Sequence, residues 1–214
     1  MAGNVLLRAE DRVVLFDVQQ QVTLAELMAF GVNYAFWSND MAYVALVSKQ
    51  GWGGHVFPFL LSLIGVLILA ITIANKRLEQ MAFIQEPVRV KSGVWDEQNV
   101  FVYSTLTHIK YALPQGDSGI IRTIDQVVYP VHIKGQTLCC LDRDARVRII
   151  AIDPTEYSFK LALLTKRYET VVAIANNSTL IGEAVIAYLQ QKGYPEVSTV
   201  SKQSDMLAHL MAFS

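Results

Sequence analysis

Val32-Asn33-Tyr34-Ala35-Phe36-Trp37 has a counterpart further along the chain in Val90-Lys91-Ser92-Gly93-Val94-Trp95. Each hexamer is followed by a polar turn and then by an apolar strand, which starts near Ala42 in the first copy and near Val100 in the second. A third, weaker copy without the tryptophan is Val128-Tyr129-Pro130-Val131-His132-Ile133. The sequence therefore contains an internal repeat.

The spacing of the copies becomes regular once one segment is set aside. The second and third copies end 38 residues apart, at Trp95 and Ile133, whereas the first and second end 58 residues apart. Residues 51–70 number 20 and account for the difference. A period near 40 residues, with short strands about ten residues apart, is typical of the four-stranded blades of a β-propeller.

The strand pattern predicts how much of a propeller is present. Fourteen strands are expected before residue 153, the first over Val5–Leu7, the last over Arg146–Ile152 and one of the others over Val88–Lys91. They would make three to four blades of a WD40-like β-propeller, whereas closed propellers have about four to eight. We therefore expect a partial propeller over residues 1–152, begun inside the propeller and interrupted by an apolar insertion at 51–70.

Near Asp153 the hydrophobic period lengthens from two residues to three or four, which predicts helices. Asp153-Pro154-Thr155-Glu156 favours a helix start, with an N-cap carboxylate, a proline in the first turn and a glutamate for a capping box. Helices are expected over Thr155–Thr165, Tyr168–Ala175 and Leu180–Lys192. Short helices of this kind stack in α-solenoids. The predicted fold class is mainly β followed by α, with a solenoid beginning over residues 153–197 and a divergent tail at 198–214.

One apolar segment allows a different interpretation. It begins at Val56 and ends at Ala74, and it has 19 residues without a charge. As a helix it would be about 28 Å long and could span a bilayer. The strands before and after it would then lie on opposite sides of the membrane and could not share a blade. We favour an insertion within a blade loop; the alternative is a single-span integral membrane protein with this segment as its transmembrane helix.

Composition and motifs give no sign of a reaction centre or of a nucleic-acid partner. The formal net charge of −1 favours neither nucleic acid nor an anionic membrane surface. His55, His108, His132 and His209 lack the spacing of metal ligands and a nearby carboxylate cluster. Gly51-Trp52-Gly53-Gly54 does not match a phosphate-binding loop. We therefore predict no enzyme activity and no catalytic, cofactor-binding or metal-binding residue.

The cysteines and the N-terminal residues favour a reducing compartment. Cys139 and Cys140 are adjacent, which suits neither an ordinary disulfide nor a tetrahedral metal site. We expect both to be buried strand residues. Charged residues interrupt the first twenty positions, which argues against a secretory signal and favours the cytosol.

Several stretches, in order along the chain, resemble the alpha subunit of coatomer, the COPI vesicle coat. They are Val5–Arg8, Val13–Gln20, Arg89–Gly93, Trp95–Glu97, His108–Ala112, Gly119–Thr123, Cys140–Arg143, Ile152–Glu156 and Ala187–Val197. In that family the region is the later part of the second β-propeller and the first helices of the α-solenoid. Residues 51–70 and 198–214 have no counterpart in the family.

The resemblance implies a structural subunit of the COPI coat, a scaffold for retrograde Golgi-to-ER and intra-Golgi vesicle transport. It implies that the partners are other coatomer subunits, with beta-prime contacted through the solenoid, and no nucleic acid. It further implies a cytoplasmic protein, held on Golgi and COPI vesicle membranes by the assembled coat and an ARF-class small GTPase. The first propeller, which in the family binds dilysine cargo tails, has no counterpart in this sequence, so no cargo-binding residue is carried over.

Overall fold

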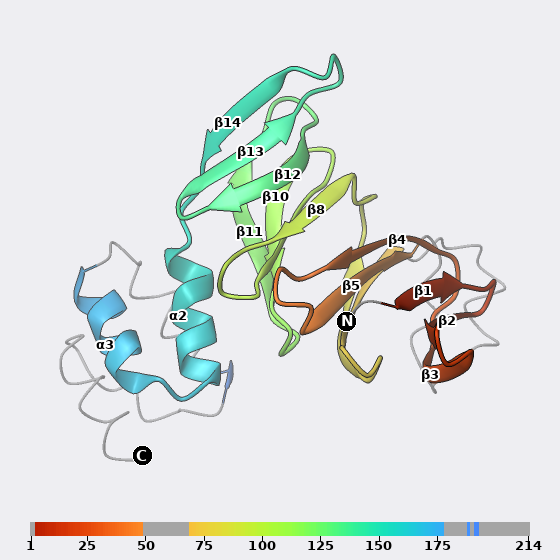
Figure 1. Cartoon of the computed structure of the whole chain (residues 1–214). Coiled ribbons are helices and arrows are strands. Elements are labelled where there is room, and N and C mark those ends of the chain that lie inside the picture. Colours follow the sequence, from red (N-terminus) through yellow and green to blue (C-terminus); the bar gives the residue numbers. More distant parts are fainter. Residues whose placement is uncertain (1–2, 49–68, 178–187, 189–190, 193–214) are drawn as a thin grey trace, which may run out of the picture. The chain divides into compact units, whose positions relative to one another are not determined.

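The computed structural model describes residues 3–48, 69–177, 188, 191 and 192. The chain divides into two compact units, residues 1–152 and residues 153–214. The described part of the first unit is built from strands alone (Figure 1). Its strands are β1 (Asn4–Arg8), β2 (Arg12–Asp17), β3 (Val22–Met28), β4 (Val32–Trp37), β5 (Tyr43–Ser48), β6 (Leu69–Asn75), β7 (Gln80–Glu86), β8 (Ser92–Trp95), β9 (Phe101–Ser104), β10 (His108–Ala112), β11 (Ser118–Thr123), β12 (Tyr129–Lys134), β13 (Thr137–Leu141) and β14 (Val147–Ala151).

These strands form four antiparallel sheets, each of which follows the order of the chain. The sheets are β1-β2-β3, β4-β5-β6-β7, β8-β9-β10-β11 and β12-β13-β14. The first strands of the second, third and fourth sheets lie side by side, because β8 packs against both β4 and β12. Consecutive meander sheets that meet at their first strands are the blades of a propeller. The predicted fold class, mainly β followed by α with a partial WD40-like propeller, is confirmed.

The transmembrane alternative for the apolar segment is wrong. The C-terminal end of that segment belongs to β6, which pairs with β5 on one side and with β7 on the other. Ala70 and Ile73 on this strand are almost fully buried within the sheets. Because β5 and β7 share one sheet, a single span that places these two strands on opposite sides of a membrane is excluded.

Residues 49–68 lie outside the described residues, and with them most of the predicted insertion at 51–70. Leu69 and Ala70 are part of β6 and pair with Glu86 and Gln85 of β7. Among the residues that the structure describes, no helix is both long enough and apolar enough to span a membrane.

The strand expected over Val88–Lys91 is also wrong, since β8 begins only at Ser92. Val90 is buried, at 3% exposure, which explains the alternating pattern that suggested a strand there. Pairing with β9 sets the observed register, with Ser92 opposite Ser104 and Trp95 opposite Phe101. β8 therefore consists of the last four residues of the repeated hexamer. The first two residues of the hexamer, Val90 and Lys91, precede the strand.

Gly93 occupies a place in β8 that has no room for a side chain. A Cβ atom at this position would overlap Cζ of the Phe101 ring and lie 2.6 Å from its Cε2. We expect Gly93→Ala to lower the free energy of unfolding by about 1–3 kcal/mol, the usual cost of overpacking a core. Urea unfolding followed by circular dichroism measures it. Phe101→Leu should make the same substitution cost less, and equal costs in both backgrounds would contradict the steric explanation.

In the second unit the described helices are α2 (Thr155–Leu164) and α3 (Tyr168–Asn177). The N-cap predicted at Asp153 is wrong, because Pro154 is the N-cap residue of α2 and it makes no side-chain capping hydrogen bond. Asp153 lies one residue earlier, and its carboxylate accepts a hydrogen bond from the backbone N–H of Thr155 at 2.9 Å. Glu156, expected in a capping box, pairs with Lys160 at 2.7 Å. The helix predicted over Leu180–Lys192 lies largely outside the described residues, as does the tail at 198–214.

Candidate functional site

The two histidines that the structure describes, His108 and His132, do not belong to a metal site. His108 contacts the hydroxyl of Thr107 through Nδ1 at 2.8 Å, and His132 is an exposed residue of β12. His55, His209 and Gly51-Trp52-Gly53-Gly54 lie outside the described residues. No group of three or more His, Cys, Asp or Glu residues that could hold a metal is present in the described part of the chain.

Cys139 and Cys140 are free thiols on neighbouring positions of β13. Cys140 is fully buried, and burial raises its pKa to about 12. Cys140 is therefore a protonated, unreactive thiol at neutral pH. Cys139 is only partly buried, opposite Ile149 of β14. The prediction of buried strand residues holds for Cys140, and Cys139 is more exposed than expected.

Trp95 joins the second sheet to the third. Its indole Nε1–H donates a hydrogen bond to the backbone carbonyl of Phe36 on β4 at 2.7 Å. The ring centroid lies 6.0 Å from Tyr43 and 5.3 Å from Phe101. Only 2% of Trp95 is exposed, so both the aromatic contacts and the hydrogen bond are shielded from water. The last residue of the repeated hexamer is thus the contact between two successive blades.

Two serine hydroxyl groups connect the third sheet to the fourth. Ser92 Oγ donates to the carbonyl of Pro130 at 3.0 Å, across a separation of 38 residues, which is the period of the sequence repeat. Ser104 Oγ donates to the carbonyl of Val128 at 2.6 Å. Asn99 Nδ2 donates to the carboxylate of Asp40 at 2.8 Å and links two turns. Each junction between these successive sheets therefore contains a specific polar contact as well as apolar packing.

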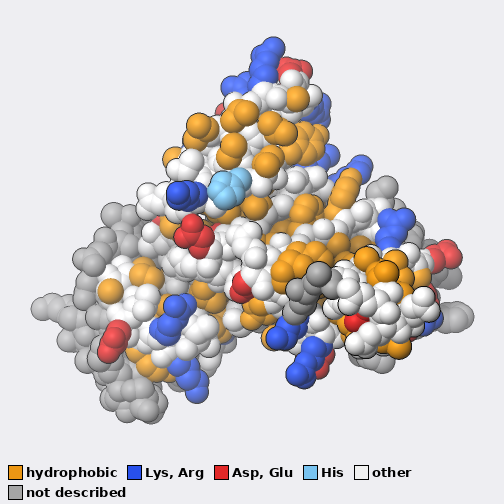
Figure 2. Space-filling model, in the orientation of Figure 1, with side chains coloured by type: hydrophobic (Ala, Val, Ile, Leu, Met, Phe, Trp, Pro, Cys, Tyr) orange, Lys and Arg blue, Asp and Glu red, His pale blue; other side chains and the backbone are white. Residues whose placement is uncertain are grey.

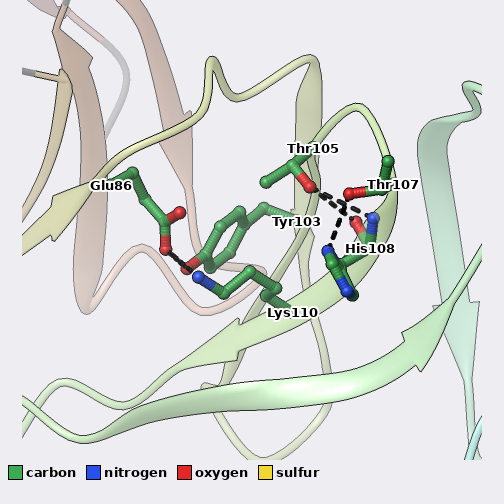
Figure 3. A network of polar contacts seen from close by, with 6 residues as sticks. All are labelled: Glu86, Tyr103, Thr105, Thr107, His108 and Lys110. Atoms are coloured by element: carbon green, nitrogen blue, oxygen red, sulfur yellow. Dashed lines mark hydrogen bonds and ion pairs between the residues drawn. The ribbon is translucent and has the colours of Figure 1, made fainter.

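A buried ion pair forms a second connection between the second and third sheets (Figure 3). Glu86, the last residue of β7, accepts hydrogen bonds from Tyr103 Oη and from Lys110 Nζ, each at 2.5 Å. Tyr103 lies on β9 and Lys110 on β10, so one carboxylate of the second sheet holds two strands of the third. The Glu86 side chain is 2% exposed and that of Lys110 19%.

Electrostatics keep the Tyr103 hydroxyl protonated. Burial, followed by the negative charge of Glu86, raises the pKa of Tyr103 far above its ordinary value. The phenol therefore acts as a permanent hydrogen-bond donor to Glu86. Sequence reasoning missed this network; its one available signal was an acidic residue at the end of the apolar strand before Pro87.

Four of the hairpins end in the same turn. Each first residue accepts, through its carbonyl, a hydrogen bond from the N–H of the fourth, and the fourth has a φ between 57° and 61°. The first residues are Ser38, Asn75, Asp96 and Asp142, and the fourth residues are Met41, Leu78, Asn99 and Ala145. In the last three turns the side-chain Oδ1 of the first residue also accepts backbone N–H groups within the turn. These four hairpin turns thus share a pattern of backbone hydrogen bonds.

Asp142 makes one of these turns sensitive to acid. Hydrogen bonds from the backbone N–H of Arg146 and from the Arg148 guanidinium hold its pKa below the ordinary aspartate value. A lowered folded-state pKa contributes stability above the ordinary value of about 3.9, and that stability is lost as the pH falls below it. We expect Asp142→Asn to flatten the fall in stability between about pH 4 and pH 2. Urea midpoints measured over this range test it, and parallel pH profiles for both proteins would contradict it.

Together these features describe a rigid assembly of blades. The described junctions are filled by a buried tryptophan, serine-to-carbonyl bonds and an ion pair, and the largest fully buried side chains include Trp95, Tyr103 and Phe101. Such interiors hold surfaces in fixed relative positions. The class of protein that this arrangement defines is a β-propeller protein.

Comparison with known proteins places the chain within this class. The chain belongs to the COPA/B second beta-propeller family, whose model matches residues 1–142. It is 50% identical over 196 residues to coatomer subunit alpha-1 of Oryza sativa subsp. japonica, which covers 92% of this chain and 14% of that protein.

The chain is also 50% identical over 196 residues to coatomer subunit alpha-2 of Arabidopsis thaliana, and the match covers 92% of this chain and 14% of that protein. Coatomer subunit alpha of Saccharomyces cerevisiae is 40% identical over 196 residues, covering 92% of this chain and 15% of that protein. The chain spans about one seventh of the length of these curated relatives.

Proposed function

We propose that this chain is a structural part of the COPI vesicle coat, a scaffold in retrograde Golgi-to-ER and intra-Golgi protein transport. The observation that carries the proposal is the 50% identity to coatomer alpha subunits over 92% of the chain. Its work is mechanical: the blades hold contact surfaces at fixed positions, and no reaction or cofactor is involved. The buried contacts of Trp95 and Glu86 support this role, because they join the second sheet to the third.

The proposed division of labour follows the two units. Residues 1–152 would supply the propeller, residues 153–197 the start of the solenoid, and residues 198–214 a divergent tail. The compact unit ending at Ile152 and the helices α2 and α3 that follow it support this division. Other coatomer subunits are the proposed partners, with beta-prime bound through the helices. Recruitment to Golgi membranes from the cytoplasm would depend on the assembled coat and an ARF-class GTPase.

Co-precipitation tests coat incorporation. The full chain carrying an affinity tag is expressed in cells, and its precipitate is probed for several coatomer subunits. We expect these subunits in the precipitate, and the chain in the large complex on gel filtration. A folded chain that is absent from the complex would overturn the proposal.

A matched pair of charge reversals locates the contact with beta-prime. Glu169 is an exposed residue of α3, and Glu97 is an exposed residue of a propeller turn. If the helices bind beta-prime, Glu169→Lys should weaken its recovery several-fold while Glu97→Lys leaves it unchanged. The reverse result would move the proposed contact to the propeller.

A further inference from the structure

The second sheet, β4-β5-β6-β7, has neighbours on both of its faces. It contains four strands, and core residues of the first sheet pack against one face. Core residues of the third sheet pack against the other face. An apolar side chain that stays exposed on this sheet is therefore not explained by a missing strand or a missing neighbouring sheet.

A hollow of about 350 Å³ opens beside the turn that joins β6 to β7. Its volume is at the lower end of the range for ligand-binding pockets. Ala42, Tyr43 and Met81 supply its apolar lining. Met81 is 48% exposed, and Met41, which precedes Ala42 in the neighbouring turn, is 44% exposed. Exposed methionines are frequent on surfaces that bind other proteins, because their flexible, polarizable side chains adapt to a partner.

Lys76 and Arg77, in the turn itself, give this hollow a positive rim. Both residues are exposed, and neither side chain makes a hydrogen bond or ion pair with a residue that the structure describes. Glu79 also lines the hollow, but its carboxylate accepts a hydrogen bond from Asn75 Nδ2 at 2.5 Å. Two unpaired cations and one engaged carboxylate leave the hollow with a net positive charge. It therefore favours a negatively charged occupant.

The turn that carries the two cations is held by its own hydrogen bonds. Asn75 Oδ1 accepts the backbone N–H of Arg77 at 2.9 Å and that of Glu79 at 3.0 Å. The N–H of Leu78 donates to the carbonyl of Asn75 at 2.9 Å, and the Leu78 side chain is buried. Because the backbone is already fixed, a ligand does not have to order this turn, which lowers the entropic cost of binding.

A narrow acidic segment suits this hollow better than an anionic membrane. The two adjoining turns carry exposed carboxylates, Asp40 after β4 and Glu97 after β8, and Asn99 links these turns through its bond to Asp40. A flat anionic surface would approach these carboxylates together with the cations and would be repelled by them. Figure 2 shows lysine and arginine side chains in separate small groups, between apolar and acidic side chains, over the face that it draws.

We propose that the hollow beside the β6–β7 turn binds an acidic segment of a partner protein. One apolar side chain of that segment enters the hollow and contacts Tyr43 and Met81. The carboxylates before and after it pair with Lys76 and Arg77. Because these ion pairs are exposed to solvent, binding weakens as the salt concentration rises. The inference goes beyond the proposed coat function and does not depend on it.

The probe is a fluorescent peptide of sequence Glu-Glu-Asp-Leu-Asp-Glu-Glu. One control peptide, Gln-Gln-Asn-Leu-Asn-Gln-Gln, keeps the apolar side chain and removes the charges. A second, Glu-Glu-Asp-Ser-Asp-Glu-Glu, keeps the charges and removes the apolar side chain. Fluorescence anisotropy with the full chain should show binding of the probe, and at least about tenfold weaker binding of each control. No binding of the probe, or equal binding of either control, would overturn the proposal.

A pair of charge reversals tests the hollow from the protein side. Lys76→Glu combined with Arg77→Glu should keep the circular dichroism of the parent and weaken binding of the probe at least about tenfold, because like charges then meet. The matched control, Lys134→Glu with Arg143→Glu, reverses two exposed charges in other turns and should leave binding unchanged. The first variant should also gain binding of the peptide Lys-Lys-Arg-Leu-Arg-Lys-Lys. Equal losses in both variants would mean that net charge, and not the hollow, determines binding, which overturns the proposal.

Two further measurements distinguish other occupants. We expect the full chain not to float with vesicles of phosphatidylserine and phosphatidylcholine through this site. Flotation that is lost in the variant with Lys76→Glu and Arg77→Glu would mean that the hollow binds a lipid headgroup. A dimer in analytical ultracentrifugation that the same variant dissociates, together with no binding of the probe, would mean that a second copy occupies the hollow. Either result overturns the proposal.

Discussion

Trp95→Ala is expected to lower the free energy of unfolding of the propeller unit by about 3–5 kcal/mol, the range for removing a large aromatic from a core. Two losses combine at this position. The indole ring, 2% exposed, leaves a cavity against Tyr43 and Phe101. The hydrogen bond from the indole Nε1–H to the carbonyl of Phe36 at 2.7 Å is also lost, which costs about 0.5–1.5 kcal/mol.

Two control variants separate these contributions. Trp95→Phe keeps most of the ring and removes only the indole donor, so it should cost less than the alanine substitution. Trp37 holds the same place in the first hexamer but is only partly buried, so Trp37→Ala should be milder than Trp95→Ala. Denaturant unfolding followed by far-ultraviolet circular dichroism gives all three values. Equal losses for Trp37→Ala and Trp95→Ala would contradict the role of Trp95 as the link between blades.

Lys110→Met is expected to have a comparable effect, about 3–5 kcal/mol, because it leaves the buried carboxylate of Glu86 without its cation. Methionine preserves the length and apolar packing of the lysine stem, so the loss reports the charge. Tyr103 remains as a donor to Glu86, but a neutral hydroxyl does not balance a buried negative charge. The expected consequence is a weaker junction between the second and third sheets.

A double-mutant cycle tests this explanation. Glu86→Gln removes the negative charge and keeps an oxygen acceptor for Tyr103. The double variant Glu86→Gln with Lys110→Met should recover much of the stability lost in Lys110→Met, because no unpaired charge is left. Urea unfolding of the four proteins gives the coupling energy. Additive losses would mean that the two side chains act independently, against the contact in the structure.

Both substitutions act on the same junction, and this bears on the proposed scaffold. Trp95 ties β8 to β4, and Glu86 ties β7 to β9 and β10. If the junction loosens, surfaces on different blades lose their fixed spacing. Variants of this kind should therefore impair coat incorporation only as far as they unfold the propeller unit, which a comparison of co-precipitation with unfolding measurements resolves.

Much of the propeller could be predicted because its signals are local. Alternating apolar residues and polar turns placed thirteen of the fourteen expected strands over observed ones, and the 38-residue repeat indicated the blades of a propeller. The exception, Val88–Lys91, failed because burial and strand pairing are separate properties. Val90 is buried without belonging to the ladder, and only its partners on β9 determine where β8 begins.

The apolar segment shows a second limit. Its hydropathy satisfied two interpretations, and the choice depended on whether the flanking strands share a sheet. The pairing of β6 with both β5 and β7 answered that question. The hydropathy of nineteen residues describes only the free energy of transferring those residues out of water. The pairing of Tyr43 with Asn75 joins positions that are far apart in the sequence, and hydropathy does not report such a contact.

By itself the sequence determined the blade period, the change from strands to helices near Asp153, and the family resemblance of the stretches from Val5–Arg8 to Ala187–Val197, because each is given by residue types and their spacing along the chain. Tertiary structure alone decided the Glu86–Tyr103–Lys110 network and the hydrogen bond from Trp95 to Phe36. These features join residues from different strands. Their partners are chosen by packing and desolvation, which no periodicity in the sequence encodes.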